Sequence, residues 1–102
     1  MYVESKLERR MFLGFIYIHI LHHASEHPIY GSWMIEELQE HGYTMSAGTL
    51  YPLLHSMEDE GLLVSEKNVV AGKQRKNYTI TSFGKEMLAK SQQKLKELVG
   101  EV

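Results

Sequence analysis

The segment from Ser46 to Gly61 has the residues of a helix that could contact a nucleic acid. Serine is a favoured N-cap and glycine a favoured residue just beyond a helix C-terminus, so they predict where this helix begins and ends. Its apolar residues, from Leu50 to Met57, recur at helical spacing and predict a buried inner face. The opposite face has small and polar side chains: Gly48, Thr49, Tyr51, Pro52, His55 and Ser56. Small residues permit close approach to base edges, and hydroxyl and imidazole groups hydrogen-bond bases or phosphates, so this face favours the major groove of double-stranded DNA.

An ordinary solvent-exposed helix face is the alternative interpretation of this side. Such faces usually carry lysine and glutamate, whereas here the only charged residue is Asp59. Ser46 adds a second feature, because the first free amides of a helix attract a phosphate. Pro52 costs a helical hydrogen bond, and a locally unfavourable residue on an outer face indicates a functional reason.

Positive charge is concentrated between residues 67 and 76. This segment holds Lys67, Lys73, Arg75 and Lys76 and no acidic residue, whereas the whole chain has a formal net charge of -2. That overall charge excludes proteins that coat nucleic acid or anionic membranes through bulk charge. A basic hairpin tip can still reach backbone phosphates or a minor groove beside the helix. A solvated basic loop is the alternative.

Glycine, proline and hydrophobic periodicity predict the elements that must position these residues. Helical windows are expected at about residues 5–25, 31–41, 46–61 and 82–99. Residues 62–80 are predicted to form a hairpin of two short strands joined by a loop that contains Gly72. A short turn that starts at Gly42 joins the second and third helices, as in a helix-turn-helix. The predicted fold class is mainly α with a small β-hairpin, a winged helix-turn-helix, in a single domain over residues 1–102.

The first predicted helix has apolar residues on two opposite sides. One stripe runs from Leu7 through Met11 to Leu21, and the other includes Phe12 and Ile16. A helix that is apolar on both sides must be buried on both sides. One stripe can cover the domain's own core, and the other is expected to meet a second copy of the chain together with the last helix. Burial within one monomer is the alternative, although about 100 residues offer little to wrap around a helix.

Five residues are expected at this interface or in a small-molecule effector pocket: Phe12, Ile16, Trp33, Met87 and Leu95. Trp33 is followed at helical spacing by three glutamates. Because aromatic faces attract cations, Trp33 and these glutamates could form the rim of a pocket for an apolar cation. The alternative is that Trp33 is partly buried against the N-terminal segment or the other subunit.

The sequence predicts neither a metal site nor a cofactor. The chain has no cysteine, which is compatible with a reducing cytoplasm. His19, His23 and His27 are spaced by four residues, but the helix is expected to end near residue 25 and no carboxylate completes an obvious ligand set. The apolar run from Met11 to Leu21 is far shorter than the roughly 20 residues that cross a bilayer. We therefore expect a soluble cytoplasmic protein.

Several segments resemble the PadR family of winged-helix transcriptional regulators. They are Tyr30-Gly31, Ser46-Ala-Gly-Thr-Leu-Tyr-Pro-Leu-Leu54, Met57-Glu-Asp-Glu-Gly-Leu-Leu63 and Arg75-Lys-Asn-Tyr-Thr-Ile-Thr-Ser-Phe-Gly84. The resemblance implies a homodimer that represses promoters, with the helix after Ser46 in the major groove and the basic wing on the flanking backbone. It also implies that the first and last helices form the dimer and that an effector pocket lies between the subunits. The DNA-facing positions that it implies are Ser46, Gly48, Thr49, Tyr51 and Pro52, with Lys73, Arg75 and Lys76 on the wing.

Two other classes of function compete with this hypothesis. A winged helix that binds a protein through Trp33 and the acidic face of its helix, without an operator, is the alternative. An enzyme is the weakest option, because no catalytic triad, phosphate-binding loop or pair of carboxylates in a cleft can be assembled from the sequence.

Overall fold

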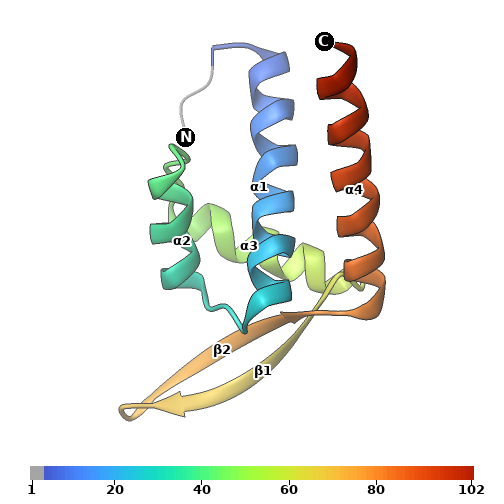
Figure 1. Cartoon of the computed structure of the whole chain (residues 1–102). Helices are drawn as coiled ribbons and strands as arrows, with labels where there is room; N and C mark the ends of the chain where they lie inside the picture. Colours follow the sequence, from blue (N-terminus) through green and yellow to red (C-terminus); the bar gives the residue numbers. More distant parts are fainter. Residues whose placement is uncertain (1–3) are drawn as a thin grey trace.

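Residues 4–102, the part of the chain that the computed structural model describes, form four helices and one antiparallel hairpin (Figure 1). The first three residues of the predicted domain lie outside this range. The elements are α1 (Lys6–Glu26), α2 (Gly31–Glu40), α3 (Ala47–Asp59), β1 (Leu63–Val70), β2 (Lys73–Ile80) and α4 (Ser82–Glu101). This order confirms the predicted arrangement of three helices, a hairpin and a last helix.

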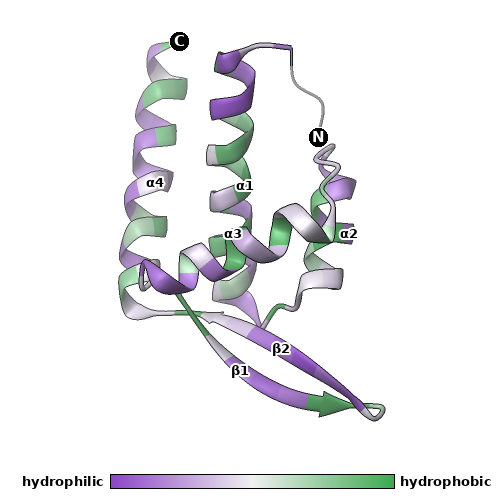
Figure 2. Ribbon diagram, turned by 180° about the vertical axis from the view of Figure 1, so that it is seen from behind, coloured by the Kyte–Doolittle hydropathy of each residue, from purple (hydrophilic) through white to green (hydrophobic). Residues whose placement is uncertain are grey.

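The helices and the hairpin occupy different ends of the molecule. α1 and α4 run side by side in opposite directions, and α3 crosses them near the end where the hairpin begins (Figure 1). Seen from behind in Figure 2, α3 lies in front of α1, and the hairpin extends away from the helices. None of the helices within residues 4–102 is both long and apolar enough to span a bilayer.

Local capping explains where the helices begin and end. The Ser5 hydroxyl accepts a hydrogen bond from the Glu8 amide at the start of α1, and the Thr81 hydroxyl accepts one from the Gly84 amide at the start of α4. α3 ends at Asp59, and Gly61, which has a φ of 81°, closes a Schellman motif just beyond it. Because these signals depend on a few neighbouring residues, the sequence predicts them well.

The hairpin is longer than the sequence predicted. Its strands pair over eight residues each, up to Val70 opposite Lys73, and Ala71 and Gly72 alone connect them. The φ angles of Ala71 and Gly72 are 52° and 77°. Two left-handed residues are typical of a type I′ turn, whose twist matches that of paired strands, so the ladder continues to the tip. The prediction of two short strands was wrong because alanine rarely adopts this conformation and gives no turn signal.

The base of the hairpin is attached to the segment between α1 and α2. The Ile29 amide donates to the Tyr78 carbonyl at 2.9 Å, and the Tyr78 amide donates to the Ile29 carbonyl at 2.7 Å. Both side chains are also buried in the core. These contacts fix the position of the hairpin relative to the helices.

Side chains from all four helices and both strands form one core. Its largest fully buried members are Ile16, Ile20, Ile29, Met34, Leu38, Leu50, Leu54, Met57 and Leu63. In α1, Leu21 from the first predicted stripe joins Ile16 and Ile20 from the second, whereas Leu7 and Met11 remain exposed. Ile16 was predicted to lie at the dimer interface or in an effector pocket. It is instead buried in the core of its own chain, where it contacts neither.

Candidate nucleic-acid interface

A tight turn joins α2 to α3 and holds α3 in place. The Tyr43 amide donates to the Leu38 carbonyl at 2.9 Å, and the Gly42 amide donates to the Gln39 carbonyl at 3.0 Å. These bonds form a second Schellman ending, and Gly42 tolerates the φ of 89° that it requires. Met45 is buried beneath the turn. The predicted helix-turn-helix is therefore present, with its geometry set by a glycine and one buried anchor.

The outer face of α3 is open to solvent, as the sequence predicted. Its exposed residues are Gly48, Thr49, Tyr51, Pro52, His55 and Ser56. On the inner face, Leu50, Leu54 and Met57 are completely buried. The helix can therefore present its uncharged residues to a ligand while its apolar face remains in the core.

Ser46 occupies the N-cap position of α3, but its hydroxyl caps no helix amide. Its Oγ instead lies 3.2 Å from the Oγ1 of Thr49. The Ser46 carbonyl accepts hydrogen bonds from the amides of Thr49 and Leu50. The amides of Ala47 and Gly48 have no partner within the helix, because such groups are left over at every helix start. This end of α3 is exposed and attracts anions.

Tyr51 and Arg75 both pack against the Tyr30-Gly31 pair at the start of α2. A Cβ atom at position 31 would overlap the Tyr51 ring, so the glycine leaves room for that ring. The Arg75 guanidinium carbon lies 3.8 Å from the centroid of the Tyr30 ring, a cation–π contact. Tyr30 thus positions a wing residue and Gly31 positions a residue of α3. Sequence reasoning assigned no role to Tyr30, although the Tyr30-Gly31 pair is part of the family resemblance.

The basic residues are spread along the wing rather than gathered at its tip. Lys73 is exposed beside the turn, whereas Arg75 and Lys76 are partly buried closer to the helices. The Lys76 Nζ lies 3.6 Å from the Oε1 of Glu58 on α3. Within residues 4–102, Lys73 has no ion-pair partner. The expectation of a cluster at the tip was wrong because the strands extend past these residues.

Glu58 joins the C-terminal end of α3 to both strands. Its Oε2 accepts hydrogen bonds from the Ser65 hydroxyl at 2.6 Å and from the Ser65 amide at 3.1 Å. The hydroxyl hydrogen bond, aided by the nearby charge of Lys76, lowers the pKa of Glu58 below its ordinary value of 4.5, although burial opposes the shift. The carboxylate form of Glu58 therefore stabilises the junction between α3 and the wing.

Substitution of Glu58 by glutamine is expected to reduce the free energy of unfolding by about 1 kcal/mol at pH 7, because a charge-assisted hydrogen bond becomes a neutral one. The folded-state pKa is depressed, so the contribution is complete above the unfolded-state pKa of about 4.3 and is lost as the pH falls through the lower folded-state value. Urea unfolding of the parent and the variant from pH 7 to pH 3 measures this difference. A gap that stays constant over this range would contradict it.

The helix-turn-helix with its basic wing matches known proteins. The model of the transcriptional regulator PadR-like family matches residues 20–90. This chain belongs to the PadR family. Transcriptional regulator Rv3488 of Mycobacterium tuberculosis is 48% identical over 85 residues, which cover 83% of this chain and 79% of that protein.

Solved PadR structures share the fold. The PadR family transcriptional regulator of Eggerthella lenta has a TM-score of 0.81 at 31% identity, covering 95% of this chain and 86% of that one. The PadR-like transcriptional regulator of Bacillus cereus also has a TM-score of 0.81 at 31% identity, covering 90% of this chain and 91% of that one. The predicted winged-helix fold class is therefore confirmed, and this PadR chain is a transcriptional regulator from a family of regulators rather than enzymes.

The remaining interface residues of this PadR chain do not form one pocket. Met87 lines an open groove of about 630 Å³ between α1 and α4, and both Met87 and Leu95 line a second groove farther along α4. Phe12 instead packs edge-on against Tyr43, with ring centroids 5.4 Å apart. Figure 2 shows hydrophobic turns on both α1 and α4. Of the five predicted residues, only Met87 and Leu95 therefore line an apolar groove between α1 and α4.

Trp33 packs against a histidine of α1 and against the residue that follows this helix. Its ring centroid lies 5.4 Å from that of His23 and 4.8 Å from that of His27, in edge-on geometry. Of the glutamates that follow it, Glu37 lies within 3.5 Å of His23 and His41. Trp33 is therefore partly buried against the N-terminal part of the chain, as the alternative predicted. The imidazoles of His23 and His27 contact the ring that was considered as the rim of a pocket for a cation.

Proposed function

We propose that this PadR-family regulator binds double-stranded DNA as a homodimer and represses transcription at an inverted-repeat operator. The observation that carries the proposal is the exposed outer face of α3, which has no Asp, Glu, Lys or Arg between Ala47 and Met57. Most exposed helix faces carry lysine and glutamate, whereas this one offers two hydroxyls near its start, Thr49 and Ser46, and an aromatic ring at Tyr51. Such a surface fits closely against base edges in a major groove.

The wing supports the proposal by supplying positive charge beside α3. Lys73 extends into solvent beside the turn and is free to contact a phosphate, while Arg75 and Lys76 stay near the junction with the helices. In Figure 2 the middle of the hairpin is hydrophilic, whereas both ends of β1 are hydrophobic. Phosphate contacts from such a wing position a protein on DNA, and base contacts from a helix determine the sequence that it reads.

Unpartnered apolar surface on α1 and α4 supports the dimer. Leu7 on α1 and Val99 on α4 are 73% and 72% exposed, and residues of the same two helices line the α1–α4 groove. A second copy that covers this surface would relate two α3 helices by a twofold axis, so that the operator has two inverted half-sites. A small-molecule effector that enters the groove and alters the angle between subunits would release the operator.

Selection of bound fragments from a random pool of DNA duplexes tests this function. The full chain should enrich one motif with two inverted half-sites, and sedimentation should give a dimer at micromolar concentration. Enrichment of no motif, together with a monomer in solution, would overturn the proposal.

Substitution of Lys73 by alanine is expected to weaken binding to all DNA sequences similarly. Each lost phosphate contact lowers the slope of log K against log salt concentration by about 0.9, or about twice that value for two subunits. Affinities measured by fluorescence anisotropy at several salt concentrations give this slope. Gln74→Ala, at the neighbouring exposed position, is the matched control and should retain the parent slope. An unchanged slope for Lys73→Ala would exclude a phosphate contact at Lys73.

No observation favours the alternative of a protein-interaction module. The surface that it would use includes Trp33, which is half-buried against α1, and Glu37, which lies against His23 and His41. These contacts leave less of the acidic face of α2 available to a partner.

A further inference from the structure

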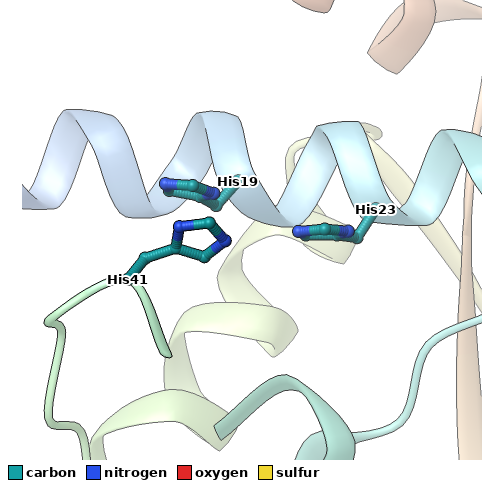
Figure 3. Close-up of side chains that lie close together, drawn as sticks. All are labelled: His19, His23 and His41. Carbon is teal, nitrogen blue, oxygen red and sulfur yellow. The ribbon is translucent and has the colours of Figure 1, made fainter. Parts of the chain in front are cut away.

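Three imidazole side chains meet beside the turn between α2 and α3. His19 and His23 come from successive turns of α1, and His41 is the residue that follows α2. One ring nitrogen from each residue lies within 4.8 Å of those from the other two. The His19 and His41 ring centroids are 4.5 Å apart, and Figure 3 shows the three side chains grouped between α1 and the end of α2.

A carboxylate oxygen lies beside two of these imidazoles. The Glu37 Oε1 is 3.4 Å from the His23 Nε2 and 3.5 Å from the His41 Nε2. Ligands of one tetrahedral zinc ion, with bonds of about 2.0–2.1 Å, lie about 3.3 Å from one another. The distances from the Glu37 oxygen to the two imidazole nitrogens are therefore close to the distance between two ligand atoms of one zinc ion.

The His23 side chain has an unsatisfied nitrogen at this position. Its Nε2 is buried and has no hydrogen-bond partner within residues 4–102, since the approach of Glu37 is close but is not aligned as a hydrogen bond. A buried polar atom without a partner costs free energy, and coordination of an ion by that atom would remove the cost. The lone pair of the His23 Nε2 is therefore available to a metal ion.

Burial favours the neutral form of two of these imidazoles, His19 and His23. Burial, followed by the nearby His41, lowers the pKa of His19 below 6.5. Burial also lowers the pKa of His23, although Glu37 opposes the shift. A metal ion binds only deprotonated imidazole nitrogen, so less work is needed to remove protons from these side chains.

We propose that His19, His23, His41 and Glu37 bind one divalent transition-metal ion, for which Zn²⁺ is the probe. Imidazole and carboxylate are ligands that suit zinc and its neighbours, and no thiolate is needed. Because His41 directly precedes Gly42, the ion would link α1 to the helix-turn-helix turn. The sequence does not predict this site, because His41 comes near α1 only in the folded chain.

A second group of possible metal ligands also contains His23, so the experiment must distinguish the two groups. The second group consists of His22, His23 and Glu26, all within α1. The substitutions His41→Ala and His22→Ala distinguish the two, because each removes one exposed imidazole from only one group. Both variants change the same residue type by the same amount, so His22→Ala is the matched control.

Titration of zinc chloride into the untagged full chain, followed by calorimetry, tests the proposal. The parent should bind one zinc ion per chain, His41→Ala should bind at least about ten-fold more weakly, and His22→Ala should bind like the parent. Circular dichroism without metal checks that the variants are folded. Cobalt(II) bound to the parent should also give the intense visible absorption of a tetrahedral site. This measurement needs no variant.

Three results would overturn the assignment. They are no zinc binding by the parent, equal binding by the parent and His41→Ala, or an equal loss in His22→Ala. A cobalt spectrum of six-coordinate type would contradict the tetrahedral ligand set. None of these measurements involves DNA, so the metal site and the operator proposal can fail separately.

Discussion

Tyr51→Ala is expected to weaken specific operator binding by roughly 10- to 100-fold, equivalent to about 1–3 kcal/mol, the discrimination that one good base contact provides. The Tyr51 side chain is 47% exposed and lies in the middle of the outer face of α3. The space left by Gly31 holds one edge of its ring, so the exposed edge has a defined position. Loss of the ring removes a preorganised contact and leaves the buried face of α3 unchanged.

The affinity of each variant for the selected operator and for an unrelated duplex measures this effect. Tyr51→Ala should lose this affinity for the operator and bind the unrelated duplex like the parent, since phosphate contacts from the wing remain. Tyr51→Phe keeps the ring and removes the hydroxyl, so it separates base stacking from hydrogen bonding. Gln93→Ala on the exposed face of α4 is the control for a neutral substitution. If Tyr51→Ala discriminates as well as the parent does, α3 does not read the operator through Tyr51.

Gly84→Ala is expected to lower the free energy of unfolding by about 2–3 kcal/mol. A Cβ atom at position 84 would overlap the carbonyl oxygen of Leu62 and lie 2.6 Å from the Cγ1 of Ile80. The carbonyl belongs to the backbone at the start of β1, where it accepts the hydrogen bond of the Thr81 amide. α4 can make room only by moving away from the hairpin, and that movement breaks the packing that joins them.

Gly100→Ala is a matched control in the same helix, since no atom lies within 4 Å of the Cβ that it adds. Alanine favours a helix interior over glycine by about 0.5–1 kcal/mol, so this variant should be neutral or more stable. Urea unfolding of both variants at one fixed protein concentration gives the comparison, because dimer formation makes stability depend on concentration. Equal stabilities for the two variants would show that α4 and β1 are not in close contact at Gly84.

The sequence predicted the helices because their boundaries depend on neighbouring residues. Gly42 and Gly61 end α2 and α3, and Thr81 caps α4 through its own hydroxyl. The exposed face of α3 was predictable for the same reason, since helical spacing alone separates Tyr51 and Pro52 from Leu50 and Leu54. The family was recognised from these same segments.

The wing and the apolar surfaces were predicted less well because their contacts connect distant residues. The strand ladder reaches Ala71, which has no turn signal of its own, and Arg75 packs on Tyr30 through a contact that spans 45 positions in the sequence. Ile16 belongs to an apolar stripe that was predicted to meet a partner, but its side chain lies in the core. Hydrophobic periodicity shows which side of a helix must be covered, but not which segment covers it.

By itself, the amino-acid sequence determined the order of the elements, the glycines that follow α2 and α3, and the outer face of α3 that has no charged residue before Glu58. These features follow from helical spacing and from local hydrogen bonds. The tertiary structure alone decided that Lys76 pairs with Glu58 while Lys73 stays exposed, and that Gly31 holds the Tyr51 ring. It also brought His41 beside His19 and His23. Each of these arrangements needs two segments that are distant in the sequence to be close in space, and core packing supplies that proximity.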